Sequence, residues 1–374
     1  MTRVSQISIF TLLLVLLTAF PIAAQKAGPV RFRMTLLSLY ENSDLIFIGR
    51  LDKKEDYGTN RVGNGFTVVT TKTYFDVSTV LKGETRKFIV LDDEEFRYQI
   101  QPRNDNEAPR EAVFIEDIDS YDADAQPKPG DTVLAFVSKQ GDAFELTDQR
   151  DGLKKISPQD AAVYSSRISE LNSIFMDKPE PEELAEWLVR CAEEPVTRWD
   201  GAHELLQGFR RIKWQEKATP KSPDGFDPLI SGDLGRDAAR NLTAEQKTEL
   251  TQILLRFEVR PDMTAPRLSA GDRELISLVK LWDTSSVANY LAAQLRSQAF
   301  SAHENAGFMF MIAELLGDAK AASLARRYAD QLSLLDANGG LPDANKSELQ
   351  KKAATSFLSL IDKLLAVDRS KNPC

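Results

Sequence analysis

Apolar and polar residues alternate along several stretches in the first half of the chain. Residues 74–83 (YFDVSTVLKG) switch between the two faces of an extended backbone and are rich in aromatic and β-branched side chains. A two-residue period of this composition predicts a half-buried strand. Residues 43–51 (SDLIFIGRL) and 131–138 (DTVLAFVS) have a similar strand-like character. The pattern therefore predicts β structure in this half.

Other segments extend this β pattern. Residues 65–83 are long enough for one bent strand or a hairpin, and 34–42 fit a short helix or a strand. No helix between these strands is long enough to connect parallel neighbours, so we expect an antiparallel barrel or sandwich. Further strands are predicted in KFIVLDD (87–93), EAVFIED (111–117) and AFELTDQ (143–149).

At Ser157 the period changes from two residues to that of a helix. Tyr164, Ile168, Leu171 and Phe175 fall on one helical face. The same spacing predicts inward faces in the later segments: Leu184, Trp187, Leu188 and Cys191; Ala202, Leu205, Leu206 and Phe209; Leu250, Ile253, Leu254 and Phe257; Leu275, Leu278, Val279 and Trp282; Val287, Leu291 and Leu295; Ile312, Leu315 and Leu316; Leu324, Tyr328, Leu332 and Leu335; and Leu349, Phe357, Leu360, Ile361 and Leu364.

Local signals place several helix ends in this half. Thr243 and Gln246 have the spacing of a capping box, and Thr284 is predicted to cap another helix. Gly317 suits a helix stop. The segment 218–235 is rich in Pro, Gly and Asp and predicts a long surface loop.

The first 24 residues have the order of a secretory signal peptide. Arg3 precedes the uncharged apolar run 9–20, and small residues lead up to Ala24, where we expect cleavage. The alternative, an uncleaved anchor, is disfavoured because a membrane span needs about 20 apolar residues. We therefore expect a secreted or periplasmic protein with three further parts: a β-barrel domain over 30–156, an α-helical domain over 157–368 and a tail over 369–374.

The β half resembles the netrin-type module, the OB barrel shared with tissue inhibitors of metalloproteinases. The resemblance rests on SDLIFIGRL (43–51), TKTYFDVSTVLKG (71–83) and KPGDTVLAFV (128–137). It implies an OB-like barrel with Gly49 and Gly83 at strand bends. Those inhibitors reach the enzyme's zinc with an N-terminal Cys, whereas this chain has no Cys before Cys191, so the mechanism does not carry over. The barrel interior would hold Ile46, Ile48, Phe75 and Val77.

Part of the helical half is similar to a HEAT-type repeat. Residues 312–328 (IAELLGDAKAASLARRY) carry this similarity. The segments 275–291 and 308–325 can be laid over one another with Trp282-Asp283 on Gly317-Asp318, an offset of 35 residues. A repeat of this length would stack helix pairs into an array. An irregular helical bundle is the alternative.

Composition fits soluble globular domains, with 42% hydrophobic and 28% charged residues. The formal net charge is −9, and losing Arg3 with the signal segment would make it about −10. This balance argues against nucleic acid or an anionic membrane as a partner through the overall field. A protein or polysaccharide partner is expected.

No catalytic signature appears in the sequence. The only histidines are His203 and His303. Both are followed by Glu, but each lacks the second His of a zinc-protease helix, with Gln207 at that position in the first case. Nucleophile elbows and phosphate-binding loops are likewise missing from the sequence. We therefore assign no catalytic, cofactor-binding or metal-binding residue.

Four other features suggest chemistry without fixing it. The acidic runs 92–95 and 116–124 are read as a strand end and a solvated loop, with calcium at the second as the alternative. Cys191 is expected to be buried in a helix face, and its pairing with Cys374 stays open. The segment 208–217 (GFRRIKWQEK) could form a basic–aromatic edge for an acidic partner or an ordinary helix end.

These patterns favour an exported, non-catalytic binding protein. The fold class expected is two-domain: an all-β, OB-like antiparallel barrel followed by an all-α array or bundle. Two alternatives of different class stay open, a secreted hydrolase and, from the resemblance of the β half alone, a protease inhibitor.

Overall fold

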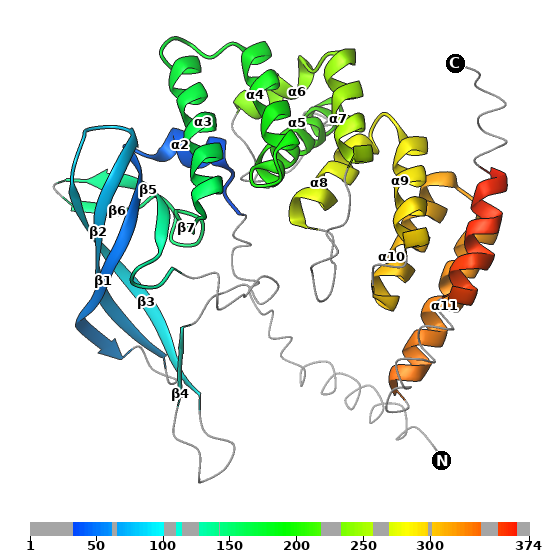
Figure 1. Ribbon diagram of the computed structural model, residues 1–374, viewed down its shortest axis with the longest axis horizontal. Helices are drawn as coiled ribbons and strands as arrows, with labels where there is room; N and C mark the ends of the chain where they lie inside the picture. Colours follow the sequence, from blue (N-terminus) through cyan, green and yellow to red (C-terminus); the bar gives the residue numbers. More distant parts are fainter. Residues whose placement is uncertain are drawn as a thin grey trace, which may run out of the picture. The chain divides into compact units, whose positions relative to one another are not determined.

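An antiparallel sheet is followed by a long series of helices in the computed structural model (Figure 1). The structure describes residues 33–61, 66–100, 110–113, 127–141, 143–217, 233–256, 269–297, 301–337 and 351–364. Met34–Cys374 forms one compact unit. The predicted layout of β structure followed by α structure is confirmed at this level.

Seven strands of the described chain form one antiparallel sheet. Its order is β4-β3-β2-β1-β5-β6, and β7 also pairs with β5. Because β3 and β6 also contact each other, the sheet curls into a nearly closed barrel. The strands are β1 (Leu45–Arg61), β2 (Phe66–Lys82), β3 (Phe88–Ile100), β4 (Arg110–Val113), β5 (Thr132–Gln140), β6 (Ala143–Leu146) and β7 (Leu153–Lys155).

The barrel interior is apolar and is centred on two aromatic rings. Phe47 and Phe75 are fully buried there and meet edge to face, with ring centroids 5.6 Å apart. The interior positions of Phe75 and Val77 agree with the prediction. The prediction was wrong for Ile46 and Ile48, which point to the opposite side of β1 and join the hydrophobic cluster of the helices. Both faces of this part of β1 are buried, so alternation could not reveal which residues face inward.

Irregular pairing bends the two longest strands. Residues 66–82 form one strand rather than a hairpin, and its register with β1 shifts at four places, one of them between Ile48 and Gly49. A Cβ atom at position 49 would lie 2.6 Å from the carbonyl oxygen of Asp76, so the strands approach this closely only because the residue is glycine. The acidic run 92–95 does not end β3, which continues to Ile100.

The short segment 36–42 is a helix, α2 (Leu36–Asn42), and the later helices follow the predicted period. Tyr164, Ile168 and Leu171 are buried, as are Leu184, Trp187, Leu188 and Cys191. The helices are α3 (Pro158–Ile174), α4 (Pro181–Glu193), α5 (Arg198–Lys217), α6 (Asp233–Arg240), α7 (Ala244–Arg256), α8 (Ala270–Val279), α9 (Thr284–Ser297), α10 (Ala302–Leu316) and α11 (Ala319–Ala337), with another over 351–364.

Helix ends mostly match the local signals. Thr243 and Gln246 form the predicted reciprocal bonds, and Gly317 ends α10 with a left-handed backbone. The prediction of Thr284 as a cap was wrong: the Asp283 carboxylate accepts the Ser286 N–H, so α9 is capped one residue earlier. Segment 218–232 lies outside the described residues, and α6 occupies the end of the predicted loop.

Buried carboxylates attach the start of α2 to elements far away in sequence. Asp151 accepts the Met34 N–H at 2.7 Å, and Asp200 on α5 accepts the Leu36 N–H at 2.7 Å. Glu204, also on α5, accepts the hydroxyl of Thr35, the residue that caps α2. Negative charge at the first turn of a helix is favoured by the helix dipole. These bonds therefore fix α2 between the barrel and α5.

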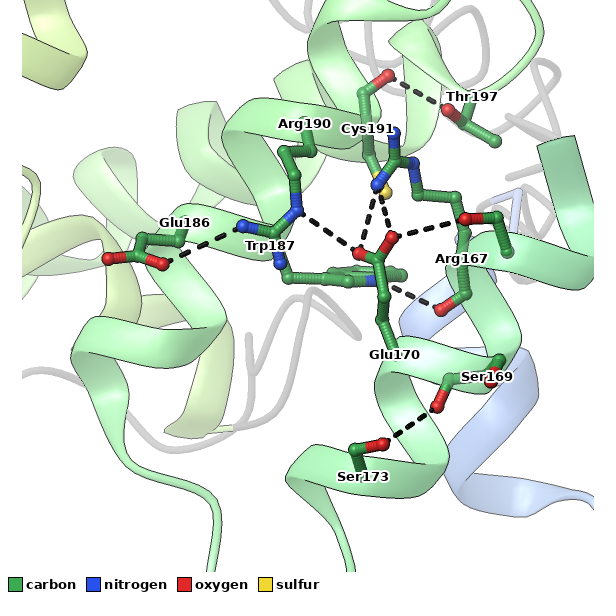
Figure 2. Close-up of polar contacts among 10 residues, drawn as sticks. Arg167, Ser169, Glu170, Ser173, Glu186, Trp187, Arg190, Cys191 and Thr197 are labelled. Carbon is green, nitrogen blue, oxygen red and sulfur yellow. Dashed lines mark hydrogen bonds and ion pairs between the residues drawn. The ribbon is translucent and has the colours of Figure 1, made fainter.

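An ion-pair network joins α3 to α4 (Figure 2). Glu170 accepts two bonds from Arg167, at 2.6 and 2.9 Å, and one at 3.1 Å from Arg190 on α4. The indole N–H of Trp187 donates to the Arg167 carbonyl at 2.9 Å. Because Trp187 is fully buried and Glu170 is mostly buried, this network fixes the angle between the two helices.

The buried hydroxyl of Tyr328 on α11 should make the stability of the protein depend on pH in the alkaline range. The Tyr328 hydroxyl has no hydrogen-bond partner among the described residues, and burial raises the pKa of Tyr328 to about 12. The folded-state pKa of Tyr328 exceeds the unfolded value. The preference of the folded protein for the protonated hydroxyl therefore stabilises it fully below about pH 10, and this stabilisation is lost as pH rises through about 12.

We expect Tyr328→Phe to raise the free energy of unfolding at pH 7 by up to about 1 kcal/mol and to weaken its decline above about pH 10. Urea denaturation at the two pH values measures both effects. Equal alkaline loss in the variant and the parent protein would contradict this prediction.

Candidate functional site

The outer side of β1, β2 and β3 exposes a group of aromatic and lysine side chains. We call it the aromatic face and define it as Lys53, Tyr57, Lys72, Tyr74 and Phe88. Tyr57 is 54% exposed and Phe88 is 50% exposed, which is unusual for large rings. The residues come from three adjacent strands, so the sheet itself positions them.

A register shift in β1 creates this face. Leu51 pairs with Phe75 and points into the barrel, whereas the next paired residue, Lys53, stands opposite Tyr74. The extra residue between them changes which face the following side chains occupy. Lys53 is therefore placed on the outer side beside Tyr74.

The aromatic side chains are held by their neighbours. The Lys53 ammonium lies 4.5 Å from the Tyr74 ring centroid, and the Lys72 ammonium lies 4.9 Å from that of Tyr57. The rings of Tyr74 and Phe88 are 6.0 Å apart. Cation–π contacts of this kind reduce the rotamer freedom that each side chain would lose on binding.

Charges of both signs lie among the rings. Lys53 and Glu55 form a 2.7 Å ion pair, and Lys72 lies 4.0 Å from Asp92. The hydrogen bond between Lys53 and Glu55 raises the pKa of the lysine and lowers that of the carboxyl. A hydrogen bond to Glu55 also raises the pKa of Tyr74. The face thus combines apolar rings with donors and acceptors and has no single dominant charge.

Both histidines lie in helices, in different settings. His203 on α5 stacks on Trp199 with ring centroids 4.6 Å apart, and its Nδ1 atom lies 3.5 Å from Glu274 on α8. His303 is exposed in the first turn of α10. In the described part of the chain, no group of three or more His, Cys, Asp or Glu residues could hold a metal ion.

The cysteine that was expected to be buried, Cys191, is buried. Cys191 is completely buried, and this burial raises the pKa of its thiol well above the usual value. Cys374 and the acidic loop 116–124 lie outside the described residues, so pairing and calcium binding stay open. In the segment 208–217, Arg211 lies 3.6 Å from Asp233, and the described side chains end before Trp214.

The aromatic face was not identified from the sequence. Tyr74 lay in the best-predicted strand, but Tyr57 and Phe88 belong to other strands, whose pairing decides whether they meet. One clue was present in the sequence. Lys72 and Tyr74 both lie on the side of the β2 segment that alternation predicts to face solvent.

Comparison with protein-family models, curated proteins and solved structures gives no match to this chain. The resemblances to netrin-type and HEAT-type modules therefore stay predictions. No helix in the described residues has the length and apolar character needed to cross a bilayer.

Proposed function

We propose that this chain is an exported, non-catalytic binding protein that holds a protein partner on its aromatic face. The observation that carries the proposal is the exposure of Tyr57 and Phe88 on one side of the sheet. Export is supported by the signal-like pattern of residues 1–24.

A protein partner suits this surface better than a charged polymer. Aromatic residues are enriched among the residues that dominate protein–protein binding, with charged groups at the rim. The Phe88 side chain has no polar atom and makes no hydrogen bond to water. Burial of its ring against a partner is therefore favourable. The mixture of lysines and carboxylates offers complementary pairing to a protein of either charge.

The finer fold proposed is an OB-type barrel followed by stacked helix pairs. β1 pairs with β2 along most of its length and with β5 over its first part, with an irregularity at Gly49, where a strand of a small barrel would bend. Helices that pack together are mostly close in sequence, such as α9 with α10 and α10 with α11. This pattern supports an array.

The proposal predicts which side chains a partner needs. Tyr57→Thr/Phe88→Thr keeps β-branched residues in the strands but removes both exposed rings. We expect partner affinity to fall at least about 30-fold, since truncating a central aromatic residue typically costs more than about 1 kcal/mol. Crosslinking followed by capture from an envelope extract identifies the partner, and titration of the purified pair measures the loss.

Met176→Thr is the matched control, because Met176 is 83% exposed and lies outside the aromatic face. It should bind as the parent protein does. Equal affinity of the double variant and the control would contradict the proposal, as would capture of a polysaccharide alone.

A further inference from the structure

A hollow of about 380 Å³ lies between α7 and the start of α9, away from the strands. Its volume is at the small end of the roughly 300–1,000 Å³ range typical of small-molecule sites. The lining residues are Ala244, Lys247, Thr248, Thr251, Gln252, Trp282, Asp283 and Ser286.

The indole of Trp282 forms a fixed, partly exposed wall of this hollow. Its N–H donates to the Thr251 hydroxyl at 3.2 Å, and that hydroxyl donates in turn to the Lys247 carbonyl at 3.0 Å. The ring also packs against Phe209, with centroids 6.1 Å apart. Because its polar atom is already bonded, the indole offers a ligand only its apolar ring.

Polar groups surround this ring with several kinds of hydrogen-bonding capacity. One carboxylate oxygen of Asp283 caps α9 by accepting the Ser286 N–H at 2.9 Å, and a carboxylate has further acceptor sites for a ligand. The exposed amide of Gln252 can donate and accept, and the Lys247 ammonium can donate. The hollow carries one positive and one negative side chain, so it has no net preference for an ion.

We propose that this hollow binds a small neutral polyhydroxylated ring, such as a single sugar. Such a molecule has an apolar C–H face for the indole and rim hydroxyls that both donate and accept hydrogen bonds. A carboxylate ligand would meet Asp283, and a cation would meet Lys247. This site is separate from the aromatic face and does not depend on the function proposed for it.

Saturation-transfer NMR and calorimetry of the full-length protein with a panel of hexoses and N-acetylhexosamines and, for comparison, with free amino acids test the proposal. We expect at least one sugar to bind with a Kd of about 0.1–10 mM, as a few hydrogen bonds and one stacking contact would give. Gln252→Ala should weaken this binding about 5- to 20-fold. Asp283→Asn should weaken it similarly while keeping α9 capped, because Asn caps helices as well as Asp does.

Glu249→Ala is the matched control, because this exposed residue is on α7 but does not line the hollow. It should leave the affinity unchanged. Binding of no sugar in the panel would overturn the proposal, and so would sugar binding that survives both Gln252→Ala and Asp283→Asn. Binding of free amino acids in place of sugars would also overturn it.

Discussion

Asp272→Ala should lower the free energy of unfolding by about 3–5 kcal/mol, because it leaves a buried guanidinium without its counter-charge. Arg198 and Asp272 lie 2.8 Å apart, with side chains 8% and 4% exposed. Asp272 also completes the capping box of α8 with Ser269, and loss of that bond adds to the cost. Urea denaturation of the parent and variant proteins measures the difference.

Three further variants separate this pair from ordinary surface charge. Arg198→Met/Asp272→Ala should lose less stability than the sum of the losses from Arg198→Met and Asp272→Ala alone, because the unpaired charge is removed. Glu314→Ala breaks the exposed Lys280–Glu314 pair and should change stability by less than about 1 kcal/mol. A loss from Asp272→Ala as small as that from Glu314→Ala would show that Arg198 reaches water in the native protein.

Gly201→Ala and Gly307→Ala should shift stability in opposite directions. A Cβ atom at position 201 on α5 would lie 2.3 Å from the Leu188 carbonyl oxygen on α4, so the two helices would have to separate. We expect a loss of about 2–4 kcal/mol. A Cβ atom at position 307 on α10 would meet nothing within 4 Å, so alanine there should gain about 0.5–1 kcal/mol of helix stability.

Thermal and urea denaturation of both glycine variants provide the comparison. The chemical change is identical in the two, so helix propensity cancels and the difference reports the α4–α5 contact. Equal and favourable shifts would mean that α5 does not approach α4 this closely.

The helical half was predictable because its buried residues repeat with one period. Trp187, Ile253 and Leu291 were all assigned to inward faces, and all are buried. Cap residues were less certain, since Asp283 and Thr284 are adjacent and both are good caps. The hydrogen bond from the Ser286 N–H to the Asp283 carboxylate shows that Asp283 is the cap.

In the β half, the sequence predicted where strands lie but not which side chains face outward. In 45–48 every position is apolar, so the sequence could not tell that Phe47 faces the barrel and Ile48 the helices. The aromatic face depends on a register shift after Leu51 and on pairing among three strands. Neither the register shift nor the strand pairing produces a periodic pattern in the amino-acid sequence.

The carboxylates that hold α2 were missed for a related reason. No role was predicted for Asp200 from the sequence, and Glu204 was considered only as the residue that follows His203 in an incomplete zinc motif. Their partners, Leu36 and Thr35, lie more than 160 residues earlier. Contacts over this distance along the chain produce no local pattern.

Hydrogen–deuterium exchange of the protein with its captured partner tests the aromatic face most directly. We expect slower exchange on partner binding in 53–57, 72–76 and 88–92, with α10 and α11 unchanged. Protection confined to the helices, with those three strand segments exchanging as in the free protein, would contradict this expectation.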